Sequence, residues 1–400
     1  MFSSPYLRAA LAWWGSRALL LLYAVHQPVP RGDVAYYFRG LEAEARGERA
    51  MSEYPDASIA PLRLLYHLVG GEQQSFVIAL LLLMLSLDGL FCYALARRRA
   101  WWALGFWLLF ALALAPLFTR RLDLLPGLTV AAAALFLARS PRCASALLAL
   151  ATALKLWPVA LASGLVGHWR SAGTWVRLAW FGGALVLLTA ASTLTQGWWR
   201  VLSPLTYQDE RGLQSEAITA TPFLWLRLTD SERWSIDYAP SQSYEVFGPG
   251  ISWGLHAATA LTAAAALIII GITAWRFLRQ AEYRPEATRA LWLLTVMLIL
   301  MTAKVFSPQY LLWVAPLLAV ILALDSDSGA IPRPLRWCAA TLLGAAVLTC
   351  LVYPVFFDQF LATPAHGGVV FIATLRNILI VAATACAAAW CLRILRRERR

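Results

Sequence analysis

The chain is 400 residues long, and 60% of its residues are hydrophobic whereas only 14% are charged. A soluble globular protein has roughly half of its residues apolar and about a quarter charged, so this composition argues against a soluble protein. The 34 Lys and Arg residues outnumber the 22 Asp and Glu residues and give a net charge of +12. Such an excess suits nucleic acid or an anionic bilayer, and the high apolar content favours the bilayer. We expect an all-α polytopic membrane protein with no nucleic-acid partner.

Apolar runs recur along the chain at lengths that suit membrane helices of about 20 residues. They lie near 7–25, 75–96, 100–118, 124–138, 178–196, 251–275, 290–306, 308–324, 337–357 and 370–392. One further run, 143–167, is interrupted by Lys155 and Pro158, and we interpret it as two short helices that turn there and return. Non-helical backbone at that depth is tolerated only inside protein or beside a water-filled cavity. The sequence predicts one integral membrane domain over 1–400, with about twelve transmembrane helices including the two short broken ones.

The distribution of arginine among the loops predicts the orientation in the membrane. One set of loops holds 18 arginines against five acids, whereas the opposite set holds 16 of the 22 acids. Because Lys and Arg concentrate in cytoplasmic loops, we expect a multi-pass plasma (inner) membrane protein with both termini in the cytoplasm. The long loops, about 26–74 and 197–250, then face outward. No cysteine falls in an outer loop, so no disulfide is expected, and no Cys/His spacing indicates a metal site.

The first outer loop contains two amphipathic segments. Apolar side chains recur at helical spacing over 34–45 and again over 59–69, a pattern typical of helices that lie on the membrane surface. Asp33 stands at the start of the first segment, where it is either a helix N-cap or a functional carboxylate. Glu53 and Asp56 are further acid candidates, and as turn residues they can equally be solvated. The aromatic side chains of the loop 197–250 suit both a membrane-interface belt and stacking against sugar rings.

Five basic residues lie where a charge is unexpected or costly. They are Arg120 and Arg121 in a tiny outer loop, and Lys155, Lys304 and Arg376 in apolar surroundings. A guanidinium offers a planar fork of donors for phosphate oxygens, and an ionisable group within the membrane usually faces a cavity or a partner. We interpret the five as the lining of one outward-facing anionic-ligand pocket. The alternatives are an Arg121–Asp123 pair and snorkelling of long side chains to the headgroups. Asp88, the only acid deep in a membrane run, is expected to be paired.

Short motifs, in order along most of the chain, make it resemble a known enzyme family. They are Asp33 in GDVAYY, Tyr54–Pro55 with Pro61 downstream, Arg121–x–Asp123, Lys155–Leu156–Trp157–Pro158, and Ser307–Pro308–Gln309–Tyr310 with Trp313. The chain resembles the GT-C superfamily of membrane glycosyltransferases and, more specifically, glycosyltransferase family 87, the polyprenyl-phosphate-mannose-dependent mannosyltransferases of actinobacteria. One departure is Asp56–Ala57, where relatives more often carry a second proline directly after Tyr–Pro.

The resemblance implies a GT-C fold and an inverting glycosyltransferase whose catalytic face is formed by the outer loops. It would move a sugar, expected to be mannose, from a polyprenyl-phosphate donor to a glycolipid or cell-envelope glycan acceptor. Asp33 would act as the general base, and fixed cations would stabilise the leaving phosphate. The expected phosphate-binding residues are Arg120, Arg121, Lys155, Lys304 and Arg376. The expected substrate-binding residues are Tyr36, Tyr37, Glu53, Tyr54, Asp123, Gln309 and Tyr310.

No cofactor and no obligatory metal are expected, because cationic side chains can stabilise a lipid-phosphate leaving group. The alternative function is a flippase or transporter for an anionic lipid or glycolipid, which would use the same basic pocket without a base. Transporters usually show repeated halves and a binding site near the membrane midplane, and this sequence shows neither.

Overall fold

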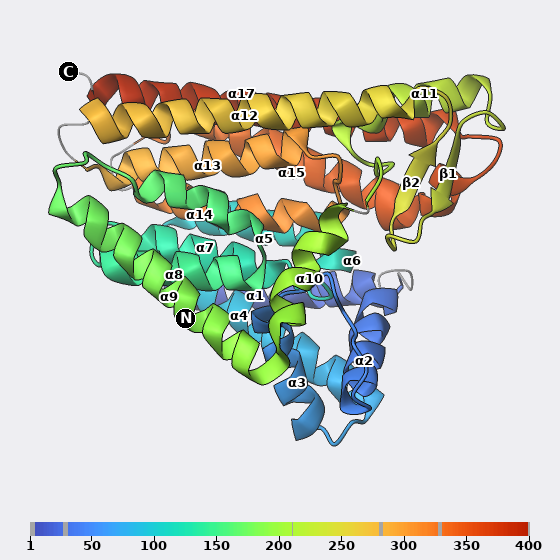
Figure 1. Cartoon of the computed structure of the whole chain (residues 1–400), viewed down its shortest axis with the longest axis horizontal. Helices are drawn as coiled ribbons and strands as arrows, with labels where there is room; N and C mark the ends of the chain where they lie inside the picture. Colours follow the sequence, from blue (N-terminus) through green and yellow to red (C-terminus); the bar gives the residue numbers. More distant parts are fainter. Residues whose placement is uncertain (1–4, 27–30, 210, 280–282, 327–329, 399–400) are drawn as a thin grey trace. The chain divides into compact units, whose positions relative to one another are not determined.

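The computed structural model describes residues 5–26, 31–209, 211–279, 283–326 and 330–398 (Figure 1). Helix accounts for 79% of the structure, and the described residues form one sheet, which has two antiparallel strands. Six of the described helices are long and apolar enough to cross a membrane. The protein is therefore an all-α membrane protein, as its composition predicts. The total of about twelve crossings stays a prediction.

The chain divides into two compact units, and each is described by itself. Unit 1 comprises Met1–Ala162, Val176–Thr206 and Ala315–Ile331. Its helices are α1 (Pro5–Val25), α2 (Arg31–Ala45), α3 (Asp56–Leu68), α4 (Gln73–Arg97), α5 (Trp101–Ala113), α6 (Ala115–Phe118), α7 (Leu124–Phe136) and α8 (Pro141–Leu154). Three further helices lie mostly in this unit, namely α9 (Ala172–Gln196), α10 (Trp198–Asp209) and α14 (Leu311–Ser326).

Unit 2 comprises Ser163–Trp175, Tyr207–Val314 and Pro332–Arg400. Its helices are α11 (Thr221–Thr229), α12 (Ile251–Arg279), α13 (Pro285–Thr302), α15 (Arg333–Cys350), α16 (Phe357–Leu361) and α17 (Gly367–Glu398). The hairpin of β1 (Ser235–Tyr238) and β2 (Tyr244–Phe247) pairs Ser235 with Phe247 and Tyr238 with Tyr244. Short 3-10 helices occupy Ile218–Ala220 and Pro308–Tyr310. Helix α13 is buried along most of its length because α12 and α17 pack against it.

The helices form where the apolar runs predict them, and proline divides three of the runs. Helix α8 ends at Leu154, Lys155 has an extended backbone, and a 3-10 helix follows over Trp157–Leu165. Pro158 explains the break, because proline has no backbone N–H and disfavours helical backbone before it. The second of the two predicted short helices is thus a 3-10 helix. The runs 100–118 and 337–357 are likewise divided, near Pro116 and Pro354 respectively.

The two amphipathic segments of the first long loop form α2 and α3. Their apolar stripes are buried in protein, since Tyr37 and Ile59 have no accessible surface. The Phe38 ring lies 5.6 Å from the Tyr66 ring and 5.7 Å from the Phe76 ring, which joins α2 to α3 and α4. Burial of these faces accounts for the helical spacing of the apolar residues. Their predicted location on the membrane surface stays a prediction.

Asp88 is paired, as the sequence predicts. The Arg17 guanidinium donates two hydrogen bonds of 2.7 Å to its carboxylate, and the indole N–H groups of Trp13 and Trp107 donate two more, at 2.7 and 2.8 Å. The side chains of Arg17 and Asp88 are 2% and 0% exposed. This network joins α1, α4 and α5 and satisfies a charge that would otherwise be costly inside a membrane protein.

Candidate functional site

Asp33 forms an ion pair with Arg121. Helix α2 begins at Arg31, so Asp33 lies in the first turn, where the helix dipole favours a negative charge. Arg121 Nη1, in the turn between α6 and α7, donates to Asp33 Oδ1 across 88 residues of sequence. The Asp33 side chain remains 27% exposed, whereas the Arg121 side chain is 9% exposed. The pair therefore combines a buried cation with a carboxylate that a ligand can reach.

A second ion pair joins Asp123 and Lys155. Asp123 precedes α7 and is fully buried, and the Lys155 ammonium donates to its Oδ1. Helices α7 and α8 pack against each other, which brings the start of one beside the end of the other. The Ser58 hydroxyl of α3 donates to the Leu154 carbonyl at the end of α8. The break at Lys155 thus frees this side chain from the helix and places it at the buried carboxylate.

Two tyrosines complete this group, which we call the Asp33 cluster: Asp33, Tyr37, Tyr54, Arg121, Asp123 and Lys155. The hydroxyls of Tyr37 and Tyr54 lie 3.3 Å apart, and the Lys155 Nζ lies 5.9 Å from the centre of the Tyr54 ring. Burial raises the pKa of Tyr37, and the charge of Asp33 raises it further. Burial also raises the pKa of Tyr54 well above its usual value. Both phenols therefore stay protonated at neutral pH and can donate hydrogen bonds.

The surroundings make Asp33 a stronger base than an ordinary aspartate. Burial raises the pKa of its carboxyl group above the usual 3.8, and the nearby charge of Asp123 acts in the same direction. The Arg121 guanidinium opposes this shift without cancelling it. A carboxylate with a raised pKa, placed at an accessible position beside fixed cations, has the properties of a general base.

The other sequence-predicted residues of unit 1 lie around this cluster. Tyr36 contacts the edge of the Tyr37 ring, with 6.2 Å between ring centres. Glu53 is half-buried next to Tyr54, and its charge contributes to the raised pKa of that phenol. Arg120 Nη2 donates to the Ala24 carbonyl at 2.7 Å. Arg120 therefore holds the end of α1 beside the turn that carries Arg121.

The remaining predicted residues belong to unit 2. The half-buried Lys304 follows α13, and its carbonyl accepts a 3.0 Å hydrogen bond from the backbone N–H of Gln214. The Gln214 side-chain amide donates to the Ser307 hydroxyl at 3.2 Å. Gln309 is half-buried, and the Tyr310 ring stacks on Trp313 with 3.9 Å between ring centres. The motif over 304–313 is thus tied to the loop that precedes α11.

Arg376 directs its donors at a buried glutamate. Its Nη1 donates to Glu216 Oε2 at 2.5 Å, its Nη2 donates to the Glu216 carbonyl at 2.7 Å, and its Nε donates to Asn377 Oδ1 at 3.0 Å. Both side chains are buried, and the guanidinium lies 4.8 Å from the centre of the Phe306 ring. These contacts favour a structural role for Arg376, which holds the loop before α11 against α17.

Sequence reasoning missed a network that supports the Asp33 cluster. The fully buried Arg200 of α10 donates to the Met51 carbonyl at 2.9 Å and to the Glu44 carboxylate. Glu44 also pairs with Arg63 at 2.8 Å, and Arg63 pairs with Asp56 at 2.7 Å. The network encloses the turn between α2 and α3, which carries Glu53 and Tyr54. Arg200 lies 149 residues from Met51 and 156 residues from Glu44 in the sequence, so the charged faces of α2 and α3 are the only signal of the network.

In comparisons with known proteins, no protein-family model and no curated protein matches the chain. Among the residues that the structure describes, no group of three or more His, Cys, Asp or Glu side chains is arranged to hold a metal ion. The chemistry of the Asp33 cluster itself is therefore the basis for a function.

Proposed function

We propose that the protein is an inverting membrane glycosyltransferase that uses a polyprenyl-phosphate sugar as donor. The observation that carries the proposal is the accessible Asp33 carboxylate, with its raised pKa, held beside Arg121 and the Lys155–Asp123 pair. One base and two cations in one group suit a displacement at a sugar phosphate. The bilayer that surrounds the apolar helices would hold the lipid tail of such a donor.

The reaction needs one proton acceptor and a stabilised leaving group. Asp33 takes the proton from an acceptor hydroxyl while the hydroxyl oxygen attacks the anomeric carbon from the face opposite the phosphate. The bond between the anomeric carbon and the phosphate oxygen breaks, and its electron pair leaves with the lipid phosphate. Arg121 and Lys155 stabilise the negative charge that develops there. A single displacement inverts the anomeric centre, so a β-linked donor yields an α-linked product.

The polar groups around Asp33 would hold the transferred sugar. Protonated Tyr54 supplies a hydroxyl donor, Tyr36 supplies an aromatic face, and Glu53 supplies an acceptor. Tyr37 and Asp123 have no accessible surface, so they act by holding the Tyr54 hydroxyl and the Lys155 ammonium in position. The roles of Lys304, Gln309 and Tyr310 of unit 2 as ligands stay predictions from the sequence. We further propose mannose as the sugar, a glycolipid or cell-envelope glycan as the acceptor, and the outer face of the plasma membrane as the site of transfer. The GT-C fold and the family 87 relationship are part of the same proposal.

The proposal is tested with purified protein, radiolabelled polyprenyl-phosphate mannose and candidate glycolipid acceptors. Wild type should transfer label to an acceptor, and Asp33→Asn should lower transfer by at least about 100-fold while circular dichroism and gel filtration stay unchanged. Glu48→Gln is the matched control, because Glu48 lies in the same loop with an exposed side chain. Full transfer by Asp33→Asn, or no transfer from any polyprenyl donor, would contradict the proposal. Movement of labelled lipid across liposomes without sugar transfer would favour the transport alternative.

A further inference from the structure

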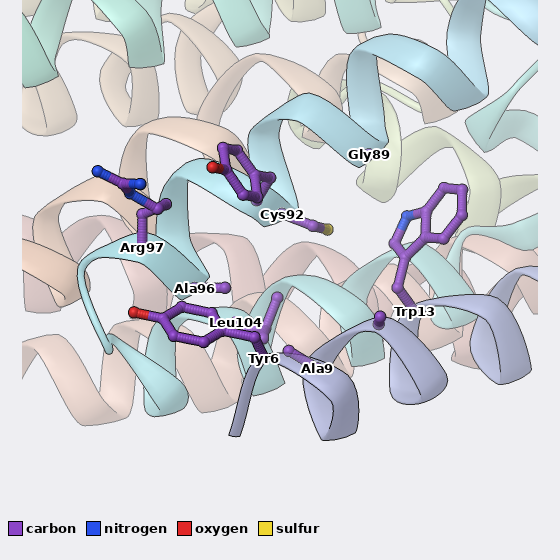
Figure 2. A pocket seen from close by; sticks show the side chains of 10 residues that line it. Tyr6, Ala9, Trp13, Gly89, Cys92, Ala96, Arg97 and Leu104 are labelled. Atoms are coloured by element: carbon purple, nitrogen blue, oxygen red, sulfur yellow. The ribbon is translucent and has the colours of Figure 1, made fainter. Parts of the chain in front are cut away.

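Unit 1 contains a pocket of about 460 Å³ between α1, α4 and α5 (Figure 2). Small side chains line much of it, among them Ala9, Gly89 and Ala96, and the space between the helices is left unfilled for this reason. Trp13 lies at one end of the pocket, while Tyr6 and Arg97 lie at the other (Figure 2). The pocket is therefore apolar along its length and polar at one end.

The polar end carries a positive charge and two hydroxyls. Arg97 is exposed at the end of α4, and Tyr6 and Tyr93 are 43% and 58% exposed. Among the residues that the structure describes, no carboxylate or carbonyl accepts a hydrogen bond from the Arg97 guanidinium. Arg98 and Arg99 follow directly. A guanidinium and phenol hydroxyls at the mouth of an apolar pocket complement an anionic headgroup that is joined to an apolar chain.

This pocket is separate from the Asp33 cluster. It lies along the first half of α1, from Tyr6 to Trp13. The other end of α1 contacts the turn of the cluster, because Arg120 donates to the Ala24 carbonyl. Helix α1 has 21 residues and is thus about 30 Å long at 1.5 Å per residue. A lipid headgroup at Arg97 would lie about one membrane thickness away from Asp33.

We propose that this pocket binds an anionic glycerophospholipid, with its phosphate at Arg97 and one acyl chain between α1, α4 and α5. The bilayer around the apolar helices supplies the chain, and Arg97 selects for negative charge. The arginine distribution predicts that this end faces the cytoplasm, where anionic lipids give the membrane surface its negative potential. The proposal stands apart from the glycosyltransferase reaction, because it uses none of the residues of the Asp33 cluster.

The bound chain would also cover the Arg17–Asp88 network. Trp13 and Cys92 line the pocket, and both donate to the Asp88 carboxylate, the indole at 2.7 Å and the thiol at 3.8 Å. A lipid that binds the folded protein stabilises it by mass action. Anionic lipid should therefore raise the melting temperature of the detergent-solubilised protein, and phosphatidylcholine should raise it less.

The test titrates phosphatidylglycerol or phosphatidylcholine into purified full-length protein in detergent and counts bound lipids by native mass spectrometry. Arg97→Gln should lower the affinity for phosphatidylglycerol roughly fivefold, the loss expected when one cation leaves an anionic-lipid site. Arg139→Gln is the matched control, because Arg139 is exposed between α7 and α8 and does not line the pocket. Equal affinity in wild type and Arg97→Gln would overturn the proposal.

A second pair of variants tests the acyl chain. Ala9→Leu fills the pocket and should lower binding of both lipids, whereas Ala12→Leu, on an exposed position of the same helix outside the pocket, should not. Unchanged lipid binding in Ala9→Leu would overturn the proposal, as would displacement of bound lipid by millimolar glycerol 3-phosphate. Lipid binding and glycosyl transfer are measured on the same preparations. Lipid binding alone decides the pocket proposal, and transfer alone decides the proposed enzyme function, so each can fail without the other.

Discussion

Two carboxylate–guanidinium pairs of unit 1 share their chemistry and differ in access. The Arg17–Asp88 pair is closed to solvent, with side chains that are 2% and 0% exposed. Its carboxylate accepts two further hydrogen bonds, from the indole N–H groups of Trp13 and Trp107. The Asp33–Arg121 pair is open on one side, with the carboxylate 27% exposed. In the sealed pair the protein itself supplies the donors. In the Asp33–Arg121 pair the carboxylate is accessible to a ligand. This accessibility distinguishes a candidate functional site from an ion pair that only stabilises the fold.

Asp33→Asn gives the largest expected effect and separates activity from stability. Transfer should fall by about 100- to 10,000-fold, the usual contribution of a general base. The free energy of unfolding should fall by less than the roughly 3–5 kcal/mol expected when a fully buried ion pair loses one partner. The raised pKa means that the folded state disfavours the ionised carboxylate, which offsets part of the cost of removing the Asp33 charge from beside the buried Arg121 guanidinium. Transfer assays and chemical denaturation of the same preparation check both outcomes. A large loss of stability would instead make Asp33 structural.

Asp88→Asn should produce the reverse result. Removing one partner of a buried ion pair leaves the other charge uncompensated and costs about 3–5 kcal/mol of unfolding free energy. In Asp88→Asn the uncompensated charge is that of Arg17. Denaturation in detergent would measure the loss. Arg17→Met combined with Asp88→Leu is the control, because replacement of both charges by apolar side chains is often neutral or stabilising. An Asp88→Asn variant that is as stable as wild type would contradict a structural role.

Arg200→Gln should give an intermediate effect, because its network positions the turn that carries Tyr54. We expect a loss of about 1.5–3 kcal/mol of unfolding free energy, the range for hydrogen bonds to charged groups. The rise in KM should exceed the fall in kcat, and Arg200→Lys should restore part of the binding. Arg46→Gln is the control, because the Arg46–Glu48 pair is exposed. A fall in kcat with an unchanged KM would place Arg200 closer to the chemistry.

The pH dependence of transfer gives the smallest and most specific effect. Asp33 must be ionised to accept a proton, so kcat/KM should fall as the pH drops through its pKa, which lies above 3.8. Arg121 lowers that pKa, so Arg121→Gln should move the acid limb to higher pH in addition to reducing activity. Arg139→Gln should leave the limb in place. An acid limb that moves to lower pH in Arg121→Gln would exclude Asp33 as the titrating group.

Local features of the chain are the part that sequence reasoning predicts well. The helices coincide with the apolar runs, and the break at Lys155 follows from Pro158 three residues later. Arg121 and Lys155 are predicted as site residues because a charge is unexpected or costly at their positions, whereas Asp33 and Asp123 are predicted from motifs of the family that the chain resembles. Their pairing was not predictable, because an Arg121–Asp123 pair is closer in sequence than the Asp33–Arg121 and Asp123–Lys155 pairs of the structure.

The sequence by itself determines that this chain is a helical membrane protein, because hydropathy and proline act within one helix length. Only the tertiary structure decides which charges meet, since Arg121 reaches Asp33 across 88 residues and Arg376 reaches Glu216 across 160. Tertiary packing also decides which carboxylate is sealed and which is open. The burial of a side chain depends on neighbours from several helices. Burial is what distinguishes the structural Arg17–Asp88 ion pair from the candidate site at Asp33.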